Sequence, residues 1–223
     1  MVGMISIFSM IVSMLLSILF PVGLAIFFSK KYKAPASALV IGGLVFIVFQ
    51  LATRIPLLGV LSRTGWYREL AKNILPLSLF LGITASLFEN IGRYLAFRFL
   101  LRKNLGWKTG VAYGIGHGGI ESILLVGFAN INNIIYSIFI NAGIFDKTIG
   151  AALPRQTADT VVNALTGTPW HMFLAGGVER VLVIIVQVAL SVCVMYSVMK
   201  KKPVFLAAAF VAHAFLDVTV VIL

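Results

Sequence analysis

The sequence predicts an all-α membrane protein built as a bundle of about six transmembrane helices. Of its 223 residues, 60% are hydrophobic and only 11% are charged, and the mean hydropathy is +1.04. At least four runs reach the roughly 20 apolar residues that a membrane span requires, and short clusters of Lys and Arg separate them. This composition excludes a soluble domain with a single anchor. We expect one integral membrane domain over residues 1–223.

The first three spans are predicted at residues 2–29, 36–53 and about 74–97. Lysines follow the first span directly, and arginines follow the third. Between the second and third spans, residues 54–72 mix basic and aromatic side chains, which suits the headgroup layer and predicts a short interfacial helix.

The fourth span starts near Trp107 and runs to about Phe128. Asparagines then lower the hydropathy over residues 129–141. Two structures are compatible with this stretch: one long helix to Ile140, or a break into a partly re-entrant segment. A separate segment here would make seven helices in place of six.

Residues 142–168 form the longest polar interval, with a helical piece expected around 155–165. The fifth span follows at about 169–199 and the sixth at 204–223. The sequence ends on Val-Val-Ile-Leu without a polar tail, so a natural chain that continues beyond residue 223 is compatible with the pattern.

The net charge of +11 is explained by topology rather than by nucleic acid, because no soluble basic domain is present to bind it. Ten Lys and Arg residues follow spans one, three and five, against six after spans two and four. Since positive loops stay on the cytoplasmic side, we expect a multi-pass protein of the cytoplasmic membrane with both termini outside. The lipid bilayer is then its main environment, and the oligomeric state is not predictable.

Ionisable residues gather where the hydropathy is highest. Four of the seven acids and all three histidines fall in predicted spans: Glu89, Glu121, Glu179, Asp217, His117, His171 and His213. Placing such side chains in a bilayer is costly, so they indicate a functional site within the membrane.

The spacing of these residues predicts that several meet. Three pairs lie four residues apart and share a helix face: Glu89 with Arg93, His117 with Glu121, and His213 with Asp217. At 1.5 Å per residue, Glu89, His117 and His213 lie at a similar depth, roughly 12–15 Å from the cytoplasmic ends of their spans.

The two intramembrane arginines have alternative roles. Arg93 either neutralises Glu89 within one helix or faces a substrate oxyanion. Arg180 can neutralise Glu179 or Glu121.

Imidazole together with carboxylate suits a divalent metal, zinc best among common ions. His117 and His213 are the stronger candidate ligands, and His171, nearer the interface, is a weaker one within a further candidate site. Glu89 or Glu121 would act as the base. The zincin pattern His-Glu-x-x-His is absent.

Several short motifs, taken in order, are similar to those of a known superfamily. Glu89-x-x-x-Arg93, Tyr113 four residues before His117, and His213-x-x-x-Asp217 resemble the CAAX protease and bacteriocin-processing superfamily of intramembrane endopeptidases. Adding Phe88-Glu89-Asn90, Gly116-His117-Gly-Gly-Ile-Glu121 and Glu179-Arg180, residues 85–217 resemble the bacterial YhfC family. That family is grouped with PrsW proteases and the Aph subunit of gamma-secretase.

The resemblance implies that Glu89 activates water, and that His117 and His213, supported by Asp217, hold a metal or the oxyanion. We therefore expect a metal-dependent intramembrane endopeptidase that cleaves a membrane-anchored peptide or protein. Two alternatives remain: a non-catalytic scaffold similar to the Aph subunit, and an ion or proton transporter that uses the same polar residues.

Overall fold

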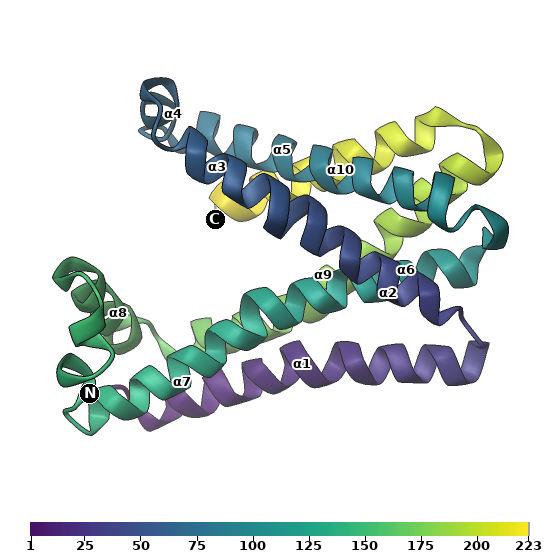
Figure 1. Ribbon diagram of the computed structural model, residues 1–223. Helices are drawn as coiled ribbons and strands as arrows, with labels where there is room; N and C mark the ends of the chain where they lie inside the picture. Colours follow the sequence, from purple (N-terminus) through teal and green to yellow (C-terminus); the bar gives the residue numbers. More distant parts are fainter. Residues whose placement is uncertain (223) are drawn as a thin grey trace. The chain divides into compact units, whose positions relative to one another are not determined.

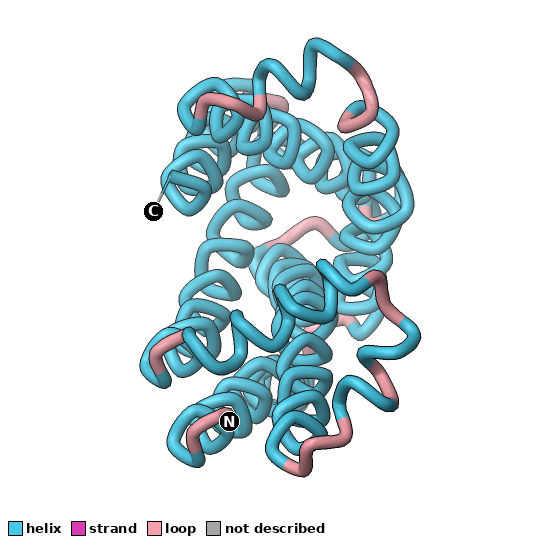
Figure 2. The backbone as a smooth tube through the Cα atoms, turned by 90° about the vertical axis from the view of Figure 1, so that its left-hand side faces the viewer, coloured by secondary structure: helices cyan, strands magenta, loops and turns pink. Residues whose placement is uncertain are grey.

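The computed structural model describes residues 1–222, and this part of the chain is helical without a strand (Figure 2). Six helical runs are long and apolar enough to cross a membrane, which confirms the predicted fold class. They are Met4–Tyr32, Ala36–Leu61, Ile74–Leu100, Trp107–Asn141, Trp170–Lys200 and Pro203–Ile222.

Three of the runs are uninterrupted α-helices: α1 (Met4–Tyr32), α9 (Trp170–Lys200) and α10 (Pro203–Ile222). The other three each contain a π-helical segment. The second run is α2 (Ala36–Phe46), η1 (Ile47–Arg54) and α3 (Ile55–Leu61); the third is α5 (Ile74–Leu95) and η2 (Ala96–Leu100); the fourth is α6 (Trp107–Ser122), η4 (Ile123–Gly127) and α7 (Phe128–Asn141). π-Helical segments are rare in proteins overall, and those that occur are often found at functional sites.

Two predicted boundaries change. The second run continues past Arg54 to Leu61, because residues 55–61 remain apolar and Pro56 falls in the first turn of α3, where its missing N–H is tolerated. In the fourth run the long-helix alternative is the one found. Its polar Asn130 stays within a helix because its side chain donates to the Val126 carbonyl, 3.0 Å away.

The short helices outside the spans lie where the composition placed them. In the basic interval, α4 (Gly65–Leu70) carries Trp66 and Tyr67, whose rings lie 5.6 and 5.8 Å from that of Phe80. In the long polar interval, α8 spans Arg155–Gly167, after the short 3-10 turns η5 (Phe145–Lys147) and η6 (Gly150–Ala152). A third such turn, η3 (Arg102–Asn104), precedes α6.

Local signals explain where the spans begin and end. Asn73 caps α5, its side chain accepting a hydrogen bond from Leu75 N at 3.1 Å. Lys33 and Lys201 end α1 and α9 in the left-handed region, with φ of 52° and 55°. Pro203 opens α10, where its fixed φ suits the first turn.

The chain forms two compact units. Unit 1 consists of Met1–Leu24 and Gly119–Ile184; unit 2 consists of Ala25–Gly118 and the residues from Ile185 onward. Helices α1, α6 and α9 contribute residues to both. A single domain over the whole chain stays a prediction.

In unit 1 the buried apolar centre includes Val2, Met10 and Leu165. Asn141, the last residue of α7, binds the backbone of Val2 twice, accepting from its N–H at 2.7 Å and donating to its carbonyl at 3.0 Å. The N-terminus is thereby fixed to α7.

In unit 2, α5 and α10 pack side by side along their lengths (Figure 1). Small residues permit close helix contacts here. A Cβ on Gly82 would lie 2.6 Å from the Val218 side chain, and one on Gly114 would lie 2.9 Å from the Gln187 carbonyl oxygen. These glycines let α5 approach α10 and α6 approach α9, which brings polar side chains of four spans together.

Candidate active site

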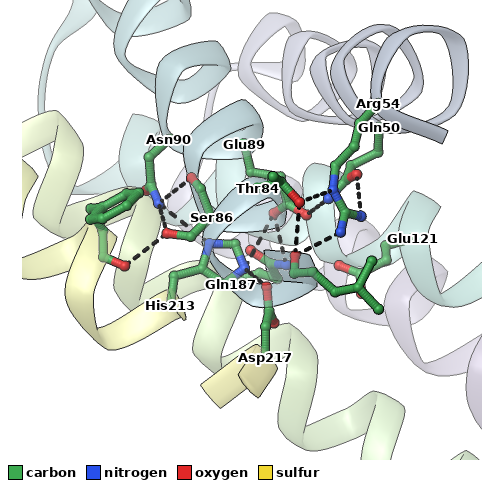
Figure 3. Close-up of polar contacts among 12 residues, drawn as sticks. Gln50, Arg54, Thr84, Ser86, Glu89, Asn90, Glu121, Gln187, His213 and Asp217 are labelled. Atoms are coloured by element: carbon green, nitrogen blue, oxygen red, sulfur yellow. Dashed lines mark hydrogen bonds and ion pairs between the residues drawn. The ribbon is translucent and has the colours of Figure 1, made fainter. Parts of the chain in front are cut away.

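Glu89 is the centre of the polar cluster in unit 2. It lies on α5 and is only 4% exposed. Its Oε1 accepts a 2.5 Å hydrogen bond from Gln50 Nε2. Its Oε2 lies 2.9 Å from Arg93 Nη2, 3.0 Å from His117 Nε2 and 3.3 Å from Gln187 Nε2. Figure 3 shows Gln50, Gln187 and His213 around this carboxylate.

The partners of Glu89 come from four other helical segments of unit 2, besides Arg93 of α5 itself. Gln50 lies on η1, His117 on α6, Gln187 on α9 and His213 on α10. Positions this distant in sequence meet only because the helices pack closely. The cluster is therefore a product of tertiary structure and not of one motif.

Arg93 neutralises Glu89 within the cluster. Its side chain is fully buried, one helical turn after Glu89. It also donates a hydrogen bond to Gln187 Oε1, and its Nη1 lies 3.5 Å from His213 Nδ1. The intrahelical pair anticipated from the spacing is therefore present, and a buried charge of either sign alone would be strongly unfavourable.

The ring of His117 is held by aromatic neighbours. It is fully buried, meets Phe46 edge-on at 5.4 Å between centroids and stacks with Tyr113 at 6.0 Å. This packing directs Nε2 at Glu89.

His213 lies between two carboxylates. Its Nε2 is 3.6 Å from Glu89 Oε2 and 3.4 Å from Asp217 Oδ2, while its Nδ1 is 3.4 Å from Asn90 Nδ2. The Asp217 side chain is 32% exposed, against 5% for that of Glu89. His213 thus links a buried carboxylate to a partly exposed one.

Arg54 is an additional cation at the edge of the cluster. From η1 it donates to Gln50 Oε1 at 3.2 Å, to the Leu81 carbonyl at 2.7 Å and to Thr84 Oγ1 at 3.2 Å. The sequence placed Arg54 at the end of the second span. Because that helical run continues to Leu61, Arg54 lies within the span. Arg54 and Arg93 balance Glu89 and Asp217, so with neutral histidines these residues carry no net charge, which lowers the cost of burial.

A second polar cluster occupies unit 1. Arg180, on α9, pairs with Glu121 of α6 at 3.1 Å and with its neighbour Glu179 at 2.5 Å. The side chains of Arg180 and Glu121 are 11% and 12% exposed, and that of Glu179 is 40% exposed. Both partners that the sequence offered Arg180 are therefore engaged.

His171 stands apart from both sets of ionisable residues. It is the second residue of α9, is exposed, and has its ring 5.8 Å from that of Trp170. Its place near the membrane surface stays a prediction.

Sequence reasoning did not identify Gln50, Gln187 and the role of Asn90. Each is a neutral amide and therefore draws less attention than an acid or histidine. A usable signal existed in the sequence, because Gln50 and Gln187 interrupt otherwise apolar runs. In the structure they are 5% and 3% exposed. Polar amides within spans commonly form interhelical hydrogen bonds.

The side chains fit a divalent metal in donor type but not in their present arrangement. Imidazole and carboxylate groups suit zinc. His117 Nε2 and His213 Nε2 both approach Glu89 Oε2, at 3.0 and 3.6 Å, which bounds their separation below about 7 Å. However, the Arg93 guanidinium shares that oxygen. Within residues 1–222, no group of three or more His, Cys, Asp and Glu side chains is arranged to hold an ion.

The fold and this cluster define a multi-pass helical membrane protein with a buried carboxylate–imidazole site inside its spans. Residues 16–223 match the family model described as YhfC intramembrane metalloprotease, and the chain belongs to this family. It is 34% identical over 208 residues to the uncharacterized membrane protein YhfC of Bacillus subtilis (strain 168), covering 93% of this chain and 81% of that protein. No solved structure matches.

Proposed function

We propose that this protein is an intramembrane endopeptidase that cleaves a membrane-anchored peptide or protein at the Glu89 cluster. The observation that supports this most is the convergence of His117 Nε2 and His213 Nε2 on one buried carboxylate oxygen, at 3.0 and 3.6 Å. The family description adds the reaction class. Mid-membrane polar groups of this kind are costly and are normally kept for function.

In this proposal Glu89 is the general base that takes a proton from the attacking water. We propose that water reaches Glu89 from the side of His213, where the 3.6 Å contact is the longest that Glu89 makes with Arg93 and the two histidines. Asp217, whose side chain is 32% exposed, lies on the same side of the cluster. Arg93 would hold Glu89 ionised and can also face the oxyanion that forms on the substrate carbonyl.

We also propose that His117, His213 and Asp217 hold the metal implied by the family description, and that this metal is zinc, which their donor types suit. The chemistry that a bound divalent metal supplies is activation of water and polarisation of the scissile carbonyl. Metal binding would require Arg93 or Glu89 to move, because both histidine nitrogens now face Glu89 Oε2, which Arg93 also contacts. We place Glu121 outside the reaction, as a partner of Arg180.

A comparison of cleavage products tests the proposal without a known substrate. Membranes from cells that produce the wild type, Glu89→Gln or His213→Ala would be compared by mass spectrometry of new protein termini. We expect new termini within membrane segments for the wild type and none for the variants. Glu69→Gln, at an exposed acid paired only with Lys72 in a 2.7 Å surface contact, is the matched control. Identical termini in wild type and Glu89→Gln would refute the proposal.

Metal content gives a second readout that does not depend on activity. Elemental analysis of the purified wild type should find about one zinc per chain, lost in His117→Ala and His213→Ala. Both variants must elute as folded protein for the comparison to count. Stoichiometric zinc that persists in both variants would remove these histidines as ligands.

One observation favours a non-catalytic scaffold as the second candidate. Donors from Gln50, Arg93 and Gln187, together with the ring nitrogen of His117 at 3.0 Å, surround the Glu89 carboxylate and occupy most of its hydrogen-bonding capacity. Such a cluster can serve to lock helices in register. A zinc-free wild type whose histidine variants lose only thermal stability would support this candidate.

A further inference from the structure

An apolar groove runs between α5 and α10 on unit 2, separate from the Glu89 carboxylate. It encloses about 390 Å³. Leu87, Ile91, Tyr94, Leu206, Ala207 and Phe210 are among its lining residues. Asn90, also in the lining, is 3% exposed and already donates to the Ser86 carbonyl at 2.9 Å. The groove therefore offers a hydrocarbon surface.

The groove continues into a basic pocket at the α5–η2 end. This pocket encloses about 310 Å³ and shares Tyr94, Pro203 and Leu206 with the groove. It adds Arg98 and Lys201 to the lining and contains no acid. Neither cation has an ion-pair partner within the described part of the chain. Two unneutralised positive charges thus stand at one end of an apolar surface.

The turn that carries Lys201 is held in one conformation. Ser197 and Lys202 form two hydrogen bonds. The Lys202 N–H donates to the Ser197 carbonyl at 3.1 Å, and Ser197 Oγ donates to the Lys202 carbonyl at 2.9 Å. Lys201 itself has φ of +55°, which is unfavourable for a residue with a Cβ. The pocket wall is therefore preformed.

The dimensions match one leaflet of a bilayer. Leu87 and Arg98 are eleven residues apart on a continuous helical run, which corresponds to roughly 16 Å at 1.5 Å per residue. Half of a bilayer hydrocarbon core is about 15 Å. The basic end lies beside the loops that carry most of the Lys and Arg, where the charge rule places the cytoplasmic headgroups.

We propose that the apolar groove and the basic pocket together bind one anionic phospholipid of the cytoplasmic leaflet. One acyl chain lies along α5 and α10, and the phosphate meets Arg98 and Lys201. Charge complementarity and the leaflet-length apolar surface, joined through three shared residues, identify this occupant rather than a peptide. The inference does not depend on the peptidase proposal.

The test measures lipid retention by native mass spectrometry. Protein purified in neutral detergent would be mixed with phosphatidylglycerol or phosphatidylcholine carrying the same palmitoyl and oleoyl chains. We expect one tightly retained phosphatidylglycerol per chain, at least about tenfold preferred over phosphatidylcholine, since two basic side chains contact the phosphate. Arg98→Gln with Lys201→Gln should remove the preference.

Two controls separate the contributions of charge and groove. Arg102→Gln with Lys202→Gln removes exposed cations of the same loops that do not line the pocket, and should keep the preference. Ala207→Phe fills the groove from an exposed position, without entering the core, and should reduce retention of both lipids.

Three outcomes would overturn the proposal. One is equal retention of the two lipids by the wild type. Another is unchanged phosphatidylglycerol binding in Ala207→Phe. The third is competition by inorganic phosphate as effective as that by the whole lipid, which would indicate a site for a free anion only.

Discussion

The two polar clusters differ in what surrounds their acids. In unit 2, Glu89 is 4% exposed and meets two histidines, two glutamines and one arginine contributed by η1, α5, α6, α9 and α10. In unit 1, Arg180 joins two glutamates from α6 and α9, one of them 40% exposed at its side chain, and no histidine takes part in these ion pairs.

The difference teaches that an intramembrane acid is not by itself a site. Glu121 can be explained as a structural residue, because Arg180 neutralises its carboxylate where α6 and α9 meet. Arg93 likewise neutralises Glu89, yet leaves two imidazole nitrogens directed at the same oxygen. Of the two clusters, the one around Glu89 is therefore the one that contains imidazole groups, the side chains whose ordinary pKa lies closest to neutral pH.

The largest expected contrast is in activity. Glu89→Gln should lower cleavage of a membrane substrate by at least ~100-fold, since a general base contributes 10²–10⁴-fold. Glu121→Gln should lower it less than ~3-fold, because Glu121 pairs with Arg180. Once a cleaved segment is known, both rates can be measured in proteoliposomes. Comparable losses of cleavage in the two variants would contradict this prediction and would indicate that Glu121 also takes part in the reaction.

The next contrast is in stability. Arg93→Gln leaves the Glu89 charge buried and should cost ~3–5 kcal/mol of unfolding free energy. Arg180→Gln also takes a cation from Glu121, but it should cost less, about 1–3 kcal/mol, because the side chains of Arg180 and Glu121 are 11% and 12% exposed, against 0% and 5% for Arg93 and Glu89. Chemical unfolding in detergent would measure both.

Glu89→Gln combined with Arg93→Gln serves as the control for the stability contrast. It removes both charges, so most of the stability should return while cleavage stays lost. Recovery of cleavage along with stability would show that Glu89 is structural.

Glycines at the two clusters give a smaller contrast. Gly114→Ala would place a Cβ 2.9 Å from the Gln187 carbonyl oxygen, so it should cost ~1–3 kcal/mol and also lower activity by displacing a Glu89 partner. Gly177→Ala meets Ser13 Cα at 2.6 Å and should cost similar stability with little change in activity. Gly176→Ala, with open space around it, is the control. Thermal unfolding and cleavage assays would report the two effects separately.

The smallest expected effect is at His171. Its exposed ring near the start of α9 contacts Trp170, so His171→Ala should change unfolding free energy by no more than about 0.5 kcal/mol and leave cleavage unchanged. A zinc loss or a tenfold activity loss in this variant would extend the site to unit 1.

Hydropathy predicted most of the fold because a bilayer leaves few structures open to an apolar run. All six spans were placed, and most of their ends moved by a few residues. The exceptions are the second run, which continues past Arg54 to Leu61, and the fourth, which continues past Phe128 to Asn141. The stretch around Asn130 was ambiguous because asparagine side chains can bond to their own helix, and hydropathy does not register that bond.

The sequence by itself determined that this is a multi-pass membrane protein, because apolar length sets the spans. It also predicted, from helical rise, that Glu89, His117 and His213 lie at similar depth. Only the tertiary structure decided that His117 and His213 share one oxygen of Glu89, that Gln50 and Gln187 complete its hydrogen bonds, and that Arg180 engages Glu121. The physical reason is that the rotation of each helix about its axis, and the glycines that permit close approach, depend on the neighbouring helices and not on any single span.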